Sequence, residues 1–135
     1  MRQWRALVLL VGLGVLMTAA LAGCSRPEDK LVGTWRTGDP QGRYVTSVFE
    51  KDGTYRYEAG NAQGVDESLA QSGRWALTTS QDHPAVAITL DSGGVVTKLY
   101  VIQESRLYLA DDWQDLRDAT ADGRFFTKVQ STQNP

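Results

Sequence analysis

Hydrophobic residues form one continuous run near the N-terminus and then many short runs that polar residues and glycines separate. The continuous run covers positions 6–16, and small residues follow it as far as Gly23. Beyond it, β-branched and aromatic residues alternate with polar ones over short stretches, which is typical of half-buried β-strands. The two parts of the chain therefore need separate interpretation.

The short alternating runs predict a series of strands joined by brief connections. Asp52-Gly53 is the best turn, because this pair tolerates the positive φ angles of tight hairpins; further hairpins are expected at 91–94 and 104–105. Short connections favour antiparallel neighbours, so we predict an all-β fold, a small antiparallel meander barrel of about eight strands without exposed edges. The predicted strands are Lys30–Thr37, Arg43–Glu50, Thr54–Glu58, Gly73–Thr78, Ala85–Leu90, Val95–Gln103, Arg106–Ala110 and Arg124–Gln130.

Two segments depart from the strand pattern. The stretch Ala59–Gln71 is polar and contains glycine, which predicts a long loop. The stretch Asp111–Thr120 predicts one short helix before the last strand, because its aspartates recur at intervals of three and four while Trp113 and Leu116 can face the opposite side.

The first residues have the organisation of an export signal. Arg2 and Arg5 form a positive end, and the apolar run and the small residues follow. A membrane-spanning anchor is the alternative, since the uncharged stretch 6–23 reaches the lower limit of about 18 residues for crossing a bilayer. The leader by itself fits both interpretations.

The end of this segment, Leu21-Ala22-Gly23-Cys24, resembles the lipobox of bacterial lipoproteins. The resemblance implies cleavage between Gly23 and Cys24 and attachment of acyl chains to the Cys24 thiol, so that the membrane is a partner of the mature chain. It also implies a cell-envelope location. Ser25 favours the outer membrane, facing the periplasm, in a Gram-negative host, and a Gram-positive host would change that expectation. An uncleaved anchor with an incidental cysteine remains the alternative.

The resulting organisation is a signal peptide over 1–23, the lipidated cysteine and a polar tether over 24–29, a barrel domain over 30–130 and a tail over 131–135. The charge is nearly balanced, with 14 basic and 16 acidic residues. Nucleic acid is therefore not an expected partner, because proteins that bind it usually carry a clustered basic excess. One cysteine excludes an internal disulfide and a thiolate zinc site.

The pattern Gly-x-Trp occurs twice, at Gly33-Thr34-Trp35 and Gly73-Arg74-Trp75. Each copy lies at or near the start of a predicted strand, where glycine permits a close backbone approach and the tryptophan can plug the end of a barrel. Coincidence in a tryptophan-containing β protein is the alternative explanation.

Together with 31–35 and 49–55, these motifs resemble the lipocalin-like domains of small bacterial lipoproteins. The resemblance implies that Trp35 is the family's signature tryptophan and that a basic residue of the last strand, Arg124 or Lys128, packs across it. The domain is shorter than a typical lipocalin and lacks the usual disulfide. A small barrel can also be filled by its own side chains.

Candidate chemistry is sparse. Asp82-His83 with a serine would suggest a nucleophilic triad, but Pro84 follows directly and an exposed turn is the simpler interpretation. The aspartates at 111, 112, 115, 118 and 122 lack the order of a calcium loop, which favours a solvated helix face over a metal site. We therefore expect no enzyme activity, no cofactor and no metal.

A ligand pocket is the remaining candidate site. Alternate residues of the predicted strands would line it, namely Tyr55, Tyr57, Leu99, Val101, Leu107 and Leu109. The alternative is that these side chains simply form the core. The sequence thus favours a lipid-anchored envelope lipoprotein with a lipocalin-like binding domain, for a small apolar ligand or for envelope maintenance. The alternative is a protein-interaction module, such as an inhibitor of a cell-wall hydrolase, whose partner is an envelope protein.

Overall fold

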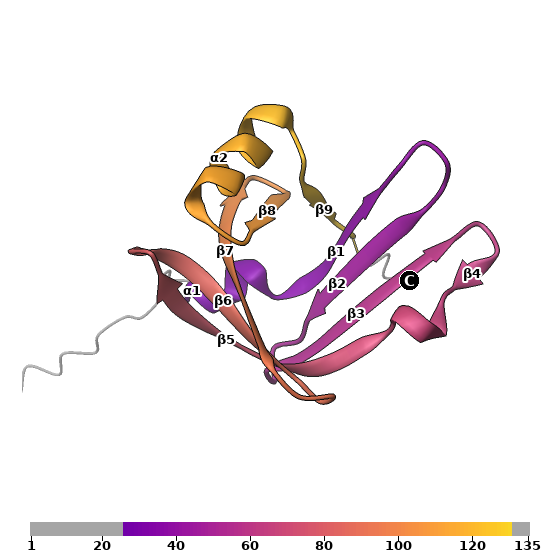
Figure 1. Cartoon of the computed structure of the whole chain (residues 1–135), viewed down its shortest axis with the longest axis horizontal. Helices are drawn as coiled ribbons and strands as arrows, with labels where there is room; N and C mark the ends of the chain where they lie inside the picture. The colour runs from indigo at the N-terminus through magenta and orange to yellow at the C-terminus, as the bar shows by residue number, and fades with distance from the viewer. Residues whose placement is uncertain (1–25, 131–135) are drawn as a thin grey trace, which may run out of the picture.

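The computed structural model describes residues 26–130, which form a small β-barrel with two helices beside it (Figure 1). The elements in chain order are α1 (Pro27–Leu31), β1 (Gly33–Gly38), β2 (Tyr44–Phe49), β3 (Thr54–Asn61), β4 (Gly64–Val65), the 3-10 turn η1 (Glu67–Leu69), β5 (Gln71–Ser80), β6 (His83–Leu90), β7 (Val95–Gln103), β8 (Arg106–Ala110), α2 (Trp113–Asp122) and β9 (Phe126–Lys128). The proposed signal peptide, Cys24 and the tail 131–135 lie outside the described residues.

The barrel is a closed ring of eight antiparallel strands, in the order β1-β2-β3-β5-β6-β7-β8-β9. β9 closes the ring, because Thr127 is paired with Arg106 of β8 on one side and with Arg36 of β1 on the other. β4 lies outside the ring and pairs only with the end of β3. The predicted all-β meander barrel of eight strands, with one helix before the last strand, is confirmed.

The predicted turn at Asp52-Gly53 is present between β2 and β3. Gly53 has φ +90°, and the Asp52 carboxylate accepts a hydrogen bond from the Thr54 nitrogen at 2.9 Å. This short connection places β2 and β3 side by side as an antiparallel pair, with Phe49 opposite Tyr55. Local turn chemistry therefore sets the register of this hairpin.

The first predicted strand begins later than expected, because Pro27–Leu31 is helical. Proline fits the first turn of a helix, and the Arg26 nitrogen donates to the Asp29 carboxylate at 3.1 Å, which caps the helix start. Residues 27–29, predicted as part of a tether, thus belong to the folded domain.

The predicted loop 59–71 is also partly wrong. β3 continues to Asn61, β4 and η1 fill half of the remainder, and β5 already begins at Gln71. The last strand is shorter than the predicted 124–130, with β9 limited to Phe126–Lys128.

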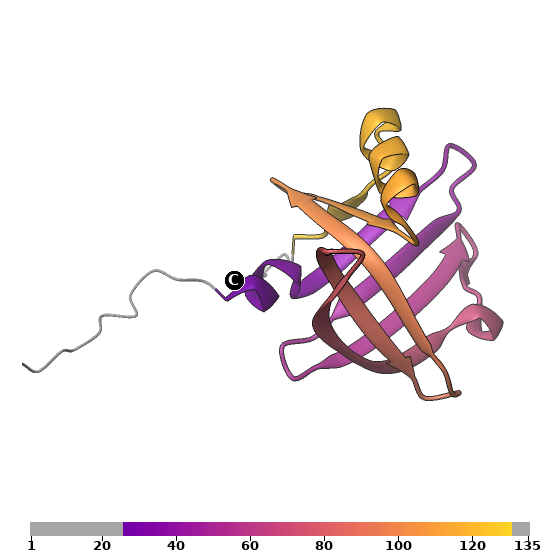
Figure 2. The same ribbon diagram turned by 60° about the vertical axis from the view of Figure 1, so that its left-hand side comes forward.

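Helix α2 packs on the outer face of the barrel, over β7 and β8 (Figure 2). Asp112 caps its first turn by accepting from the Asp115 nitrogen at 2.9 Å, and Gly123 ends it in a left-handed conformation. Its buried residues Leu116 and Ala119 form a second apolar cluster with side chains of the strands beneath. Within residues 26–130, neither helix has the length and apolar character needed to cross a membrane.

Candidate ligand cavity in the barrel

One end of the barrel is filled by a plug, defined here as Leu31, Trp35, Phe49 and Trp75. Trp35 is almost completely buried, and its indole nitrogen donates to the Leu31 carbonyl oxygen at 2.8 Å. The Trp75 indole nitrogen donates to the Glu50 carbonyl oxygen at 2.9 Å, and its ring meets Phe49 edge-on at 5.5 Å. Both indole N–H groups are thus paired, which buried tryptophans generally require.

The glycines of the two Gly-x-Trp motifs are required by the backbone around the plug. Gly33 has φ +138°, a conformation that side-chain-bearing residues rarely adopt. At Gly73, an added Cβ would lie 2.1 Å from the carbonyl oxygen of Thr89 on the neighbouring strand. Each glycine therefore allows the chain to place the tryptophan two positions later inside the barrel end.

The basic residue that packs across Trp35 is Lys128. Its Nζ lies 5.4 Å from the Trp35 ring centroid, and the two residues are paired between β9 and β1. Arg124, the other candidate, precedes β9 and instead lies 3.6 Å from the Asp122 carboxylate, with both side chains exposed. The choice of Arg124 as a fold-motif residue is therefore corrected to Lys128, because the strand begins only at Phe126.

Four of the six residues predicted to line a pocket belong to the interior cluster: Tyr55, Tyr57, Leu107 and Leu109. The other two, Leu99 and Val101, lie with the outer cluster beneath α2. Those two assignments are wrong, and in this part of β7 the residues that pack inward are Tyr100 and Ile102. Residues 99–102 are all apolar or aromatic, so alternation could not indicate which face of this strand was inside.

A cavity of about 300 Å³ lies in the barrel interior beyond the plug. This size is at the lower limit for small-molecule sites, which are typically apolar with a few polar groups. It is lined mainly by apolar side chains, with three hydroxyls, one amide and one amine. The lining residues are Ser47, Tyr55, Tyr57, Gln71, Ile88, Leu90, Val96, Lys98, Leu109 and Phe126. Three of the six predicted pocket residues are thus present, whereas Leu107 packs in the core and does not line the cavity. We call this the lumen cavity.

Two polar groups of the lumen cavity are held in place by the protein. The hydroxyls of Ser47 and Tyr55 are buried and lie 3.4 Å apart. Burial raises the pKa of Tyr55 more than this hydrogen bond lowers it, so its hydroxyl stays protonated at neutral pH. Lys98 forms an ion pair with the exposed Asp111, which draws its amine toward the start of α2.

A larger cavity of about 570 Å³ adjoins the lumen cavity and shares Tyr57 with it. Its lining comes from the ends of β1, β2 and β3, from the turn 39–43 and from η1, where Leu69 is half exposed. We call this end of the barrel, defined by the turn 39–43 and the segment 61–69, the mouth. The plug and the mouth are opposite ends of β1, at Gly33 and Gly38 respectively.

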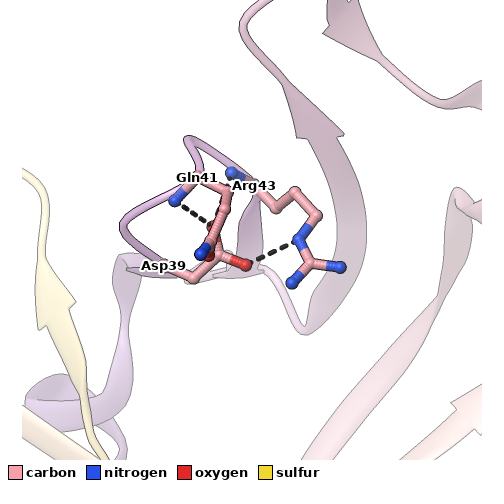
Figure 3. A network of polar contacts seen from close by, with 3 residues as sticks. All are labelled: Asp39, Gln41 and Arg43. Atoms are coloured by element: carbon pink, nitrogen blue, oxygen red, sulfur yellow. Dashed lines mark hydrogen bonds and ion pairs between the residues drawn. The ribbon is translucent and has the colours of Figure 1, made fainter.

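The rim of the mouth at 39–43 is held by one carboxylate (Figure 3). Asp39 accepts hydrogen bonds from the backbone nitrogens of Gln41 and Arg43, each at 3.0 Å, and from Arg43 Nε at 2.6 Å. Desolvation raises the pKa of Asp39, but these bonds outweigh it and hold the pKa below its usual value of 3.8. The turn is therefore a stiff part of the rim.

A contact that the sequence did not indicate joins the β5–β6 turn to α2. The rings of His83 and Trp113 are stacked with centroids 4.0 Å apart, and the Trp113 nitrogen donates to the Gln81 side chain at 3.4 Å. His83 therefore packs against the helix. No sequence signal pointed to this contact, because the two residues are 30 positions apart. The expected exposed turn at Asp82-His83 is corrected, since His83 begins β6 and is half-buried.

The helix aspartates have structural roles. Asp112 caps the helix, Asp111 pairs with Lys98, and Asp118 accepts from the Gln114 amide at 3.0 Å. Within residues 26–130, no three metal-ligating side chains are grouped as a metal site requires.

No protein-family model matches the sequence, and a search of curated proteins found no match. Among solved structures, the crystal structure of lipoprotein YedD from Klebsiella pneumoniae is similar, with a TM-score of 0.45 and 15% sequence identity. The alignment covers 76% of this chain and 74% of that chain. A likeness this distant carries no argument about function, so the fold assignment rests on the strand pairing.

Proposed function

We propose that the protein is a lipid-anchored lipoprotein of the bacterial envelope whose barrel binds a small apolar ligand. The observation that supports ligand binding is the lumen cavity, about 300 Å³ of mainly apolar space beside the plug. A barrel filled throughout by side chains would have favoured the alternative, a protein-interaction module. The hydroxyls of Ser47, Tyr55 and Tyr57 give the cavity a few polar groups that would orient a ligand.

The anchor is proposed from Leu21-Ala22-Gly23-Cys24. Acyl chains on one cysteine stabilise membrane attachment by about 0.8 kcal/mol for each buried CH₂ group, so several chains hold a protein firmly. Globomycin, which blocks the lipoprotein signal peptidase, is expected to cause an unprocessed precursor to accumulate. Unchanged electrophoretic mobility, with Cys24→Ser still bound to membranes, would contradict the anchor.

Outer-membrane residence in a Gram-negative host is proposed from Ser25, which occupies the position where aspartate would favour the inner membrane. In such a host the protein is expected to co-sediment with outer membranes on a density gradient. Ser25→Asp is expected to move it to the inner-membrane fraction. If the two proteins have the same distribution, residue 25 does not set the location.

Ligand binding is tested by calorimetric titration of the soluble domain with decanoate, a small amphiphile with an apolar tail. Saturable binding at micromolar concentration is expected for the wild type. Leu109→Trp fills the cavity and is expected to abolish the signal. Val95→Trp adds the same side chain at an exposed position, 63% accessible, and serves as the matched control.

The identity of the natural ligand or partner is tested by detergent extraction of the full-length protein followed by mass spectrometry. A lipid or another small molecule that co-purifies with the wild type and is lost in Leu109→Trp supports ligand binding. A stoichiometric envelope protein that is retained by both variants supports the interaction module instead.

A further inference from the structure

The two ends of the barrel differ in their relation to the N-terminus of the domain. α1 lies at the plug end, and the β1–β2 turn and η1 lie at the opposite end, around the mouth (Figure 2). The strands confirm this polarity, because β1 leaves α1 at Gly33 and reaches the mouth at Gly38. Any attachment of the chain before residue 26 therefore acts on the plug end.

α1 is held against the barrel in one orientation by buried contacts. Leu31 is fully buried in the plug, and its carbonyl oxygen accepts the hydrogen bond from the Trp35 indole. The Val32 nitrogen donates to the Glu28 carbonyl oxygen at 3.0 Å, which closes the end of the helix against β1. The position of Pro27 relative to the barrel is thus set by buried contacts.

The chain between the proposed lipidation site and this fixed point is very short. Cys24 and Pro27 are separated by three residue steps, and each step spans at most about 3.6 Å, so their separation is at most about 11 Å. Acyl chains on Cys24 would hold that residue at the membrane surface. Pro27 and the plug end behind it would then be confined to the layer next to the lipid.

From this geometry we infer that the barrel stands with its plug end on the membrane and its mouth facing away from the lipid. The inference rests on the proposed lipid anchor. In this orientation the plug end contacts the surface of the membrane that holds the anchor. Ligands would then enter and leave the lumen cavity from the aqueous compartment. The plug, with Trp35 and Phe49 almost completely buried, separates that cavity from the anchoring bilayer.

The charges of the plug end fit attachment by the tether rather than by electrostatic attraction. This end exposes three basic side chains and three acidic ones, so their charges balance. The basic residues are Arg26, Lys30 and Lys51, and the acidic residues are Glu28, Asp29 and Asp52. A balanced surface gains little from anionic headgroups, and such attraction would be screened by salt. The orientation is therefore expected to persist at high ionic strength.

Depth-dependent fluorescence quenching tests this orientation on the full-length lipidated protein. It would be reconstituted in vesicles of phosphatidylethanolamine and phosphatidylglycerol that contain a headgroup-labelled quencher lipid. Because the chain has one cysteine and lipidation uses its thiol, introduced cysteines can be labelled selectively. Lys51→Cys reports on the plug end, and Gln41→Cys and Gln63→Cys report on the mouth, all at exposed positions.

Quenching at position 51 is expected to exceed that at 41 and 63 by several-fold, with little change in high salt. Equal quenching at the three positions, or stronger quenching at the mouth, would overturn the orientation while leaving the anchor intact. Failure of the protein to float with the vesicles would instead overturn the anchor and with it the inference. The same labelled domains without residues 1–24, which lack both the apolar leader and the lipidation site, give the unquenched baseline when they are mixed with the vesicles.

Discussion

The Trp35 indole nitrogen and the Leu31 carbonyl oxygen are 2.8 Å apart in a fully buried environment, and this hydrogen bond joins α1 to the barrel. Trp35→Phe removes the donor, leaves a buried carbonyl unpaired and opens a small void. We expect a loss of about 2 to 3 kcal/mol in the free energy of unfolding. Trp113→Phe, at a partly exposed position, is expected to change stability by less than about 0.5 kcal/mol. Urea unfolding of the three proteins measures both values, and equal losses would contradict a specific role for Trp35.

The second glycine of the repeated motif is expected to tolerate no side chain. Gly73→Ala places a Cβ 2.1 Å from the Thr89 carbonyl oxygen, so the β5–β6 pairing must distort. The expected loss is about 3 kcal/mol. Gly42→Ala meets open space and has only the strain of φ +81°, which costs about 1 kcal/mol. A thermal melt in which Gly42→Ala is the less stable variant would be inconsistent with this packing.

The contact between Lys128 and Trp35 predicts different outcomes for two basic residues near the C-terminus. Lys128→Met keeps the aliphatic stem but removes the charge over the ring, which is expected to lower stability by about 1 kcal/mol. Arg124→Met, at an exposed site, is expected to have almost no effect. Chemical denaturation measures the free energy of unfolding of both variants and the wild type, and the comparison is valid where their m-values agree. A larger effect at Arg124 would restore that residue as the partner of the tryptophan.

Because Leu99 faces outward, we expect a substitution there to lower the stability of the protein without changing its affinity for a ligand of the lumen cavity. Leu99→Ala removes packing between β7 and α2 and is expected to cost about 2 to 5 kcal/mol. Its affinity for decanoate, measured at a temperature where the variant is folded, is expected to match that of the wild type. If the fully folded variant bound decanoate more weakly than the wild type, Leu99 would have to line the cavity.

Asp39 predicts a dependence of stability on pH. Its carboxyl pKa is depressed in the folded state by the bonds from Arg43 and Gln41. The stabilisation is therefore complete above the unfolded pKa near 3.8 and is lost as the pH falls through the lower folded value. Asp39→Asn is expected to be less stable than the wild type at neutral pH, and the difference should shrink in acid. A difference that stays constant from pH 7 to strong acid would rule out this coupling.

The strands of the barrel were predictable because their information is local. Alternation between polar and apolar residues and the turn residues at Asp52-Gly53 are sufficient to place β2, β3 and their connection. The same holds for α2, whose spacing of aspartates and apolar residues indicates a helix. Because short connections leave few ways to pair successive strands, a local pattern determines the topology of the sheet.

The features that the sequence did not reveal depend on contacts between distant positions. β7 has apolar residues on both faces, and only the packing of α2 on it distinguishes the inward Tyr100 from the outward Leu99. The short helix α1 exists because Leu31 inserts into the plug, a contact with no periodic signal in five residues. The pairing of Lys128 rather than Arg124 with Trp35 likewise follows from where β9 starts, which depends on the end of α2.

The ring-closing strand β9 consists of three residues near the end of the described chain, with two residue pairs to β8 and two to β1. A chain that emerges from a ribosome or a secretion channel with its N-terminus first exposes this strand last. β1 and β8 must therefore wait with unpaired edges until almost the whole domain has emerged. The domain is thus most vulnerable to aggregation and proteolysis late in biogenesis, when the other seven strands of the ring have emerged and β9 has not.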